Sequence, residues 1–170
     1  MAKILVVSDS HGLTNELVTI KEKHKAEVDL MLHCGDSELQ ADDPAIKDFV
    51  VVGGNCDFGS DFPKETIKTI DNKTIMLTHG HHYHVKSSLT SLEYKAKEVK
   101  ANIVCFGHSH ILGAEVINGI LFINPGSIRL PKMRLEKTYV ILEIVGDKIL
   151  INVYDINLGM LTQLSHEFAM

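Results

Sequence analysis

Short apolar runs that end abruptly in a polar side chain recur five times in the first two thirds of the chain. Residues 30–36 read Leu-Met-Leu-His-Cys-Gly-Asp, an apolar run that stops at a glycine and a carboxylate. Similar runs lead into Asp, Asn or His within residues 6–11, 50–57, 75–81 and 103–110. Strands buried on both faces have this pattern, and ligands bind at the carboxyl ends of such strands. We therefore expect the five strand ends to bring their polar side chains into one pocket.

Apolar residues that recur every three or four positions predict helices between these strands. An apolar stripe at Leu13, Leu17, Ile20 and His24 indicates one helix, and residues 87–100 carry a second. A short helix is expected over residues 43–48, because Asp caps helices and Pro occupies their first position. Strands are expected at residues 3–7, 30–33, 49–52, 66–70, 73–78, 103–106, 115–117, 120–123, 139–145 and 148–155.

Turn residues in the second half of the chain predict hairpins. Asp71-Asn72, Asn118-Gly119 and Gly146-Asp147 each separate two expected strands. Parallel strands joined by helices, followed by antiparallel hairpins, predict an α/β protein of two mixed sheets packed face to face with helices outside. No Gly-x-Gly-x-x-Gly motif is present, which argues against a plain dinucleotide-binding fold. We expect residues 1–170 to form a single domain, a common size for one core.

The composition narrows the function classes. Apolar residues make up 45% of the 170 residues, and no apolar run approaches the roughly 20 residues of a membrane helix. The net charge of −5 argues against nonspecific nucleic-acid binding, which needs a basic surface. Three cysteines are an odd count that favours a reduced protein, and the first apolar stretch is too short for a signal peptide. We expect a cytoplasmic protein that does not enter membranes.

The side chains at the five strand ends are metal ligands by type. They are Asp9, His11, Asp36, Asn55, His79, His108 and His110. A lone Asp-x-His is commonly a solvated turn, but five matching strand ends favour a metal site. In extended chain, residues two apart point to the same side, so Asp9 and His11 could share one ion, as could His108 and His110. Seven ligands exceed the four of a closed zinc site, which favours two divalent ions bridged by a carboxylate, for which we choose Asp36.

Nitrogen and oxygen ligands without a required thiolate suit Mn²⁺, Fe²⁺, Zn²⁺ or Ni²⁺ better than Ca²⁺. We take Mn²⁺ as the first choice and keep the other three as alternatives. Two such ions about 3.5–4 Å apart lower the pKa of a bridging water, so that hydroxide exists near neutral pH.

These motifs resemble the signature of the calcineurin-like metallophosphoesterases. The resemblance rests on Asp9-x-His11, Gly35-Asp36, Gly54-Asn55, His79 and Gly107-His108-x-His110, in the family's order over residues 1–111. Residues 124–127, Asn-Pro-Gly-Ser, are similar to the small bacterial and archaeal phosphodiesterase branch. The resemblance implies a four-layer α/β/β/α sandwich. It also implies that one metal is held by Asp9, His11, Asp36 and His110, and the other by Asp36, Asn55, His79 and His108.

The resemblance therefore implies a binuclear metal-dependent hydrolase, a phosphodiesterase in which the bridging hydroxide attacks the phosphorus of a small phosphoester in line. Two alternatives stay open: a phosphomonoesterase or nucleotide pyrophosphatase with the same site, and a non-catalytic interaction scaffold like the eukaryotic retromer subunit of this fold. The sequence is compatible with a homo-oligomer and does not specify the natural substrate.

The chain departs from the family pattern after Asn55, which we count among the catalytic residues. Many members carry a His at the next position, whereas this chain has Cys56. A thiol with an ordinary pKa of about 8.5 imitates imidazolium poorly, and nearby cations would push it toward thiolate. His81, which follows Gly80, is the expected substitute that assists the leaving group.

The remaining histidines, two of the cysteines and a basic cluster are expected to lie outside the metal site. His82 and His84 are expected in a solvated loop, His24 and His166 at the surface, and His33 in a structural role. Cys34 and Cys105 are expected to be small buried residues. The basic cluster formed by Arg129, Lys132, Arg134 and Lys137 is interpreted as a solvated loop, with attraction of an anionic substrate as the alternative.

Overall fold

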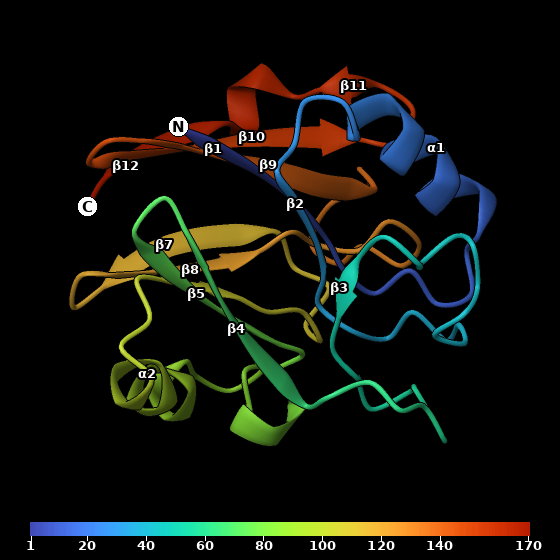
Figure 1. Ribbon diagram of the computed structural model, residues 1–170, viewed down its shortest axis with the longest axis horizontal. Helices are drawn as coiled ribbons and strands as arrows, with labels where there is room; N and C mark the ends of the chain where they lie inside the picture. The colour runs from blue at the N-terminus through green and yellow to red at the C-terminus, as the bar shows by residue number, and fades with distance from the viewer.

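Two mixed sheets face each other in the computed structural model, which describes all of residues 1–170 (Figure 1). The first sheet contains β1 (Ala2–Val7), β2 (Leu30–His33), β3 (Val50–Val51), β9 (Thr138–Val145), β10 (Lys148–Asp155), β11 (Gly159–Met160) and β12 (His166–Ala169). The second contains β4 (Glu65–Ile70), β5 (Lys73–Thr78), β6 (Ile103–Cys105), β7 (Gly113–Ile117) and β8 (Ile120–Asn124).

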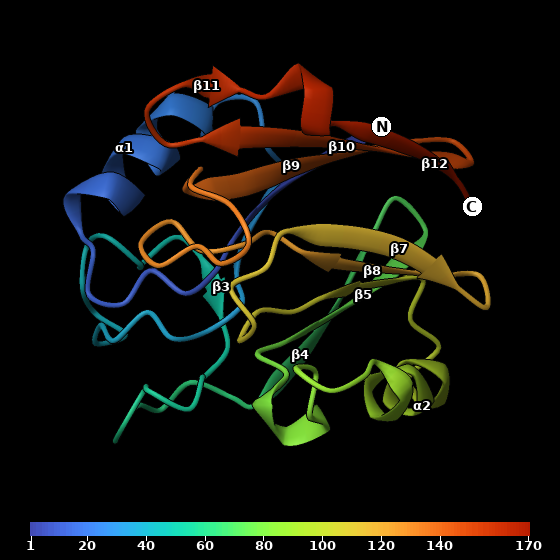
Figure 2. The same cartoon turned by 180° about the vertical axis from the view of Figure 1, so that it is seen from behind.

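Helices cover the outer faces of both sheets. Helix α1 (Asn15–His24) packs on the first sheet and α2 (Thr90–Glu98) lies outside the second, as both views show (Figures 1 and 2). The layers are therefore α/β/β/α, as the resemblance implied. Neither α-helix has the length and apolarity needed to cross a bilayer.

The strands that carry the polar ends run parallel. In the first sheet β1 pairs with β2 and β2 with β3, and in the second β5 pairs with β6 and β6 with β8. The strands of the expected hairpins pair antiparallel, as β4 with β5, β7 with β8 and β9 with β10. Parallel neighbours end at the same edge of a sheet, so this topology delivers successive strand ends to one place.

Three apolar layers explain why the strands are apolar on both faces. In β1, Ile4 and Val6 face the other sheet and join the central cluster, whereas Leu5 and Val7 face α1. A third cluster fills the space between the second sheet and α2 and includes Met76. Alternate side chains of one strand thus enter two different cores.

The predicted helix over residues 43–48 is wrong, because the segment forms only turns. Its Asp43 cap is present, since the carboxylate accepts the N–H of Ala45 at 2.8 Å. The chain nevertheless turns again at once, with the N–H of Phe49 bonded to the carbonyl of Ile46. Both of these apolar residues are buried under β3, and we infer that their burial overrides the helical signal. The sequence also gave no indication of β11, β12 or the 3₁₀ turns η1 (His81–Tyr83) and η2 (Thr162–Leu164).

His24 is buried rather than at the surface, which corrects the expectation from the sequence. It ends the apolar stripe of α1 and therefore faces the sheet. Its Nδ1 lies 2.5 Å from Glu27 Oε1 and its Nε2 lies 2.9 Å from Tyr139 Oη, so both ring nitrogens have partners. His166 is exposed as expected, and Cys34 and Cys105 are both fully buried.

Asp155 at the end of β10 ties three backbone groups together and provides a stability prediction. Its carboxylate accepts N–H groups from Lys137, Asn157 and Leu158 at 2.8–2.9 Å. Burial raises the pKa of Asp155, but these hydrogen bonds lower it by more, and the net pKa is below the ordinary value. The stabilisation is therefore present above the unfolded-state pKa of about 3.9 and is lost as pH falls through the folded-state pKa.

We expect Asp155→Asn to lower the free energy of unfolding by about 1–3 kcal/mol at pH 7, because the amide nitrogen cannot accept a backbone N–H. The difference from wild type should shrink toward pH 3 in urea denaturation. Asp147→Asn, a change in an exposed turn, is the control. A difference that stays constant between pH 7 and pH 3 would contradict this role.

Candidate metal centre

The turns that follow β1, β2, β3, β5 and β6 meet at one end of the two sheets. Backbone hydrogen bonds join them across the chain: the N–H of Asp9 bonds to the carbonyl of Gly35, and the N–H of Gly107 to that of His79, both at 3.0 Å. The second of these bonds links two strand ends of the second sheet. The structure therefore brings together the strand ends that the sequence singled out.

Left-handed backbone conformations, rather than extended chain, aim the candidate ligands. The φ angles of Asp9, His11, Asp36, His108 and His110 lie between 42° and 70°. The extended geometry predicted for the paired residues is therefore wrong, although Ser10, between the first pair, does point away toward His33. Each such residue costs of order 1 kcal/mol, and this kind of strain concentrates at functional sites.

Glycines next to the ligands allow the turns to approach one another. A Cβ on Gly54 would collide with the carboxylate of Asp36, and a Cβ on Gly107 would collide with the side chains of Ser8 and Asp9. Any larger residue at either position would push two ligand-bearing turns apart.

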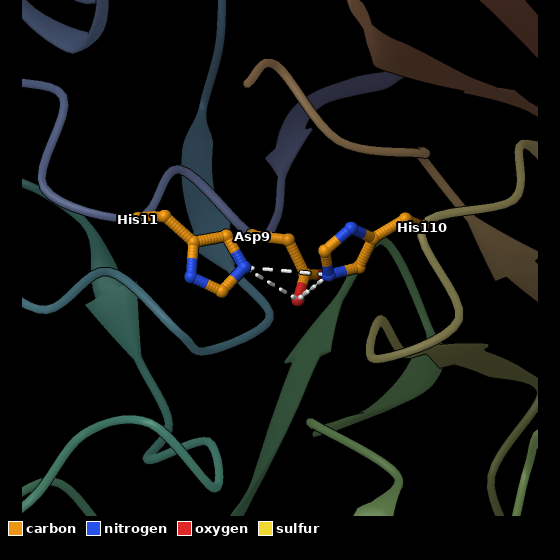
Figure 3. Close-up of side chains that lie close together, drawn as sticks. All are labelled: Asp9, His11 and His110. Atoms are coloured by element: carbon orange, nitrogen blue, oxygen red, sulfur yellow. Dashed lines mark hydrogen bonds and ion pairs between the residues drawn. The ribbon is translucent and has the colours of Figure 1, made fainter. Parts of the chain in front are cut away.

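One cluster is formed by Asp9, His11 and His110, which point toward one another (Figure 3). Oδ1 of Asp9 lies 3.1 Å from Nε2 of His110 and 3.8 Å from Nε2 of His11. The two Nε2 atoms are 3.3 Å apart. Three potential ligand atoms thus surround one point.

A second cluster is centred on the fully buried His79. Its Nε2 lies 3.2 Å from Oδ2 of Asp36, 3.1 Å from Oδ1 of Asn55 and 3.9 Å from Oδ1 of Asp9. The carboxylate of Asp36 also lies near His11 of the first cluster. It is therefore placed between the two groups, where the sequence analysis expected a bridging ligand.

Hydrogen bonds direct the ligand atoms inward. Nδ1 of His79 donates to the carbonyl of Cys34 and Nδ1 of His110 donates to that of Leu130, both at 2.7 Å. With the proton on Nδ1, the Nε2 lone pair of each ring is directed at the site, which is the usual arrangement for a metal-binding histidine.

The fit to cations rests on Asp9. Its Oδ1 is buried and has no hydrogen-bond partner, while Oδ2 accepts the hydroxyl of Ser8 and the N–H of His108. A buried carboxylate oxygen that faces imidazole lone pairs needs a cation or a proton between them. The mixed nitrogen and oxygen set is suited to divalent transition metals.

The pKa values of the candidate ligands are shifted because carboxylates and imidazole rings lie close together and are partly buried. Burial raises the pKa of Asp36, but the hydrogen bond and charge of His79 lower it by more. The nearby carboxylate of Asp9, 3.1 Å from Nε2 of His110, raises the pKa of His110 against the opposing effect of burial. Burial, together with the charges of His79 and Lys86, lowers the pKa of His108 to about 4. Burial lowers the pKa of His79, but the carboxylates of Asp36 and Asp9 raise it by more, so the site favours protonation of both His79 and His110.

His108 and His81 lie on the solvent side of His79. Their ring centroids are 5.1 Å and 5.3 Å from that of His79, and 6.0 Å from each other. His108 therefore adjoins the second cluster without joining a tight group of ligand atoms. Burial and the charges of neighbouring histidines lower the pKa of His81, whose Nδ1 is buried without a partner. Its neutral ring can donate a hydrogen bond into the site. His82 and His84 are exposed, as expected.

Cys56 lies beside the carboxylate of Asp36, and the expected effect of bound cations on its thiol stays a prediction. Its backbone N–H donates to Oδ1 of Asp36 at 2.8 Å, and its side chain belongs to a close group with His11 and Asp36. Burial and the charges of Asp36, Glu38 and Asp57 raise the pKa of the Cys56 thiol to about 11. The protein itself therefore favours the thiol, whereas cations were expected to favour thiolate.

Asp57 is a functional residue that the sequence analysis missed. Its carboxylate accepts the N–H groups of Asp36, Glu38 and Gly54 at 2.7–2.8 Å. It therefore fixes the turn after β2 to the turn after β3, and so places Asp36 relative to Asn55. The Gly-Gly-Asn-Cys-Asp sequence contains this residue but does not indicate which backbone groups it reaches.

Three further groups support the ligands, and of these only His33 was expected to have a structural role. Ser127 donates its hydroxyl to the carbonyl of Asp9 at 2.7 Å. His33 is fully buried, and because its Nδ1 accepts the N–H of Gly35, its Nε2 donates to Ser10. Glu38 lies 3.2 Å from Nδ1 of His11.

The four residues of the basic cluster differ in their contacts, and not all of them are free in solvent. Arg129 donates to the carbonyl of His11, and Arg134 pairs with Glu136 at 3.7 Å. Lys132 and Lys137 have no carboxylate within 4.0 Å of their side-chain nitrogens. Arg129 is thus anchored to a ligand-bearing turn, which the reading as a solvated loop did not include.

A family model described as the calcineurin-like phosphoesterase superfamily domain matches residues 2–147. The chain belongs to this family. A probable metallophosphoesterase of Bacillus subtilis, YsnB, is 51% identical over 152 residues, which cover 89% of this chain and 90% of that protein. A phosphodiesterase of Methanocaldococcus jannaschii, MJ0936, is 30% identical over 73% of this chain and 82% of that protein. The resemblance stated from the motifs is confirmed.

Solved structures of other proteins superpose on this chain and show the same fold. A predicted phosphoesterase from Streptococcus pneumoniae superposes with a TM-score of 0.94 at 33% identity, over 99% of this chain and 98% of that one. Vps29 from Entamoeba histolytica, in complex with zinc, gives a TM-score of 0.78 at 19% identity, over 98% of both chains. The latter likeness shows the fold alone.

Proposed function

We propose that this protein is a metal-dependent phosphodiesterase that hydrolyses a small phosphoester with two divalent ions, Mn²⁺ foremost. The observation that carries the proposal is the buried, unpartnered Oδ1 of Asp9, which Nε2 atoms of His11, His79 and His110 all face within 3.9 Å. We assign one ion to Asp9, His11, Asp36 and His110, and the other to Asp36, Asn55, His79 and His108. When bound, the ions supply positive charge that stabilises the phosphoryl oxygens and lowers the pKa of water.

The chain's own residues orient and polarise the substrate. Asn55 directs its Oδ1 at His79 and donates one amide N–H to the Cys56 sulfur at 3.6 Å, which leaves a second N–H that can donate to a phosphoryl oxygen. His81 presents a neutral ring next to His108, where it can donate to the oxygen of the leaving group as charge develops. The Cys56 thiol is a weak donor at the same rim.

Assays with a panel of metal ions and phosphoesters test the proposed function directly. Metal-stripped protein is supplied with Mn²⁺, Zn²⁺, Fe²⁺ or Ni²⁺ one at a time and assayed on p-nitrophenyl phosphate, bis(p-nitrophenyl) phosphate and a nucleoside pyrophosphate. We expect no hydrolysis without metal and the highest kcat/KM for the diester with Mn²⁺. If kcat/KM were highest for the monoester or the pyrophosphate, the proposed substrate class would change from phosphodiesters to that type of compound. Absence of hydrolysis with every ion would favour the interaction scaffold, the role considered because Vps29 has this fold.

A leaving-group series tests His81. We expect His81→Ala to lower kcat about 10²-fold for alkyl phosphodiesters and less than about 10-fold for p-nitrophenyl diesters, whose leaving groups need little assistance. His82→Ala, a change in the exposed neighbouring ring, is the matched control. Equal losses on alkyl and aryl diesters would mean that His81 does not act on the leaving group.

Replacement of Cys56 tests whether the thiol is needed. We expect Cys56→His to keep or raise kcat on aryl diesters, because imidazole is a better hydrogen-bond donor than a thiol whose pKa is about 11. Cys56→Ala serves as the comparison that removes the donor altogether. A drop of more than about tenfold in Cys56→His, with full metal content, would show that the thiol has a role of its own.

We also propose that residues 1–170 form one metallophosphoesterase domain in the cytoplasm, free to form homo-oligomers. The match over residues 2–147 and the absence of a membrane-crossing helix support the first parts of this statement.

A further inference from the structure

A cavity of about 470 Å³ lies next to the candidate metal centre, on the outer side of the second sheet. Six of its twelve lining residues are apolar: Val85, Leu89, Phe106 and Phe122, which pack in the apolar cluster under α2, together with Ile111 and Ala114. Ligand sites of proteins have this size and are mostly apolar with a few polar groups. The metal centre described above uses none of these side chains.

Two ligand-bearing turns border the cavity. Val85 packs against Gly80, where an added Cβ would lie 2.9 Å from a methyl group of that valine, and Gly80 directly follows His79. On the other side, Ser109 lines the cavity from the middle of the turn His108–His110. A molecule in the cavity is therefore next to both turns.

Ser109 brings a hydrogen-bond donor to the cavity. Its Oγ accepts Nδ2 of Asn124 at 2.9 Å and the N–H of Ile111 at 3.3 Å. Both bonds use the oxygen as acceptor, and the hydroxyl proton has no acceptor in the protein. That proton is available to an oxygen of a ligand.

The mouth of the cavity is basic. Lys86 and Lys132 line it, are exposed, and have no carboxylate within 4.0 Å of their side-chain nitrogens, and the backbone N–H of Lys132 bonds to the carbonyl of His110. Glu115 is the one acidic side chain in the wall. A net positive mouth on a protein of net charge −5 favours an anionic ligand.

We propose that this cavity binds an apolar ring of the phosphoester substrate, while the phosphoryl group lies at the metal centre beside Ser109, Lys86 and Lys132. The inference rests on the proposed function for the phosphoryl site and adds the substrate class: phosphoesters with an aromatic or similarly flat apolar substituent. It makes Ser109 and the apolar wall determinants of specificity.

Binding of unreactive ligands to the Mn²⁺-loaded protein tests the proposal without relying on turnover. Phenylphosphonate and methylphosphonate share the anionic group and differ in the ring. We expect phenylphosphonate to bind about tenfold more tightly by calorimetry. We also expect it, but not methylphosphonate, to shift the methyl signals of Val85 and Leu89 in the spectrum of the Zn²⁺-loaded protein, which avoids paramagnetic broadening.

Gly113→Leu is the variant that fills the cavity. Gly113 lines it at the start of β7, and a Cβ there meets no atom within 4 Å, so a side chain can start from this position without a clash at Cβ. We expect this variant to lose the preference for phenylphosphonate and to bind methylphosphonate as wild type does. Val116→Leu, an enlargement on the same strand outside the cavity, is the control and should keep the preference.

The outcomes separate this inference from the proposed function. Equal affinity for both phosphonates, or unmoved Val85 and Leu89 signals, would overturn the ring site even if diesters are hydrolysed. A failure of both ligands to bind would also overturn it. Absence of hydrolysis in the ester panel, with the phenyl preference intact and abolished by Gly113→Leu, would overturn the proposed reaction and keep the site.

Discussion

Replacement of Asp9 by Asn is expected to abolish function while leaving the fold intact. The change removes the charge of a fully buried carboxylate whose Oδ1 has no partner in the protein. We expect Mn²⁺ affinity to fall at least about 100-fold and kcat/KM on a diester to fall about 10³-fold, because the positive charge at the phosphoryl group is lost with the metal. Calorimetric titration and steady-state kinetics measure the two effects.

Stability of the metal-free Asp9→Asn protein separates this result from unfolding. An amide can keep the hydrogen bonds at Oδ2 but loses the charge contact with His110 at 3.1 Å, so we expect the free energy of unfolding to fall by no more than about 3 kcal/mol, with the protein still folded. Asp42→Asn removes one charge from an exposed loop and should leave binding and catalysis unchanged. Wild-type Mn²⁺ affinity in Asp9→Asn would contradict the assignment of this residue as a ligand.

Asp57→Asn is expected to damage the site without touching a proposed ligand. The amide nitrogen cannot accept the N–H groups that the carboxylate now binds, so at least one of Asp36, Glu38 and Gly54 loses its partner. We expect the free energy of unfolding to fall by about 2–3 kcal/mol, because hydrogen bonds to a charged acceptor are lost. Mn²⁺ affinity should fall about 10–100-fold, the usual effect of removing a group that orients ligands.

Asp61→Asn is the matched control for Asp57→Asn. Asp61 lies in the same loop, is exposed, and should change stability by less than about 0.5 kcal/mol when replaced. Urea denaturation of metal-free protein and Mn²⁺ titration of both variants give the comparison. If Asp57→Asn matched Asp61→Asn in both measurements, the carboxylate would not be holding the two turns together.

The sequence predicted the candidate ligands because each belongs to a local pattern, an apolar run followed by Asp, Asn or His. Parallel strands turn such local patterns into a spatial cluster, and the structure does bring Asp9, Asp36, Asn55 and His79 together. That these residues bind two metals stays a prediction. The layer order was predictable for a similar reason, since alternating helices and strands followed by hairpins allow few arrangements.

The supporting contacts were not predictable, because they depend on distant segments. Nothing in the sequence near Asp57 indicates that its carboxylate reaches the turn after β2. Asp and His adopt left-handed conformations more often than most residues, but the residue type alone does not specify them, and those of Asp9 and His108 depend on tertiary packing. His24 shows the same limit, because only the folded chain supplies the Tyr139 hydroxyl that allows the ring to be buried.

The central claim is that the strand ends hold two cations. Equilibrium dialysis of metal-stripped protein against Mn²⁺, followed by elemental analysis, measures this directly. We predict two ions per chain in wild type and a lower content in Asp36→Asn, because that carboxylate lies between both clusters. Wild-type protein that takes up no Mn²⁺, or a single ion that Asp36→Asn retains at full affinity, would contradict the account.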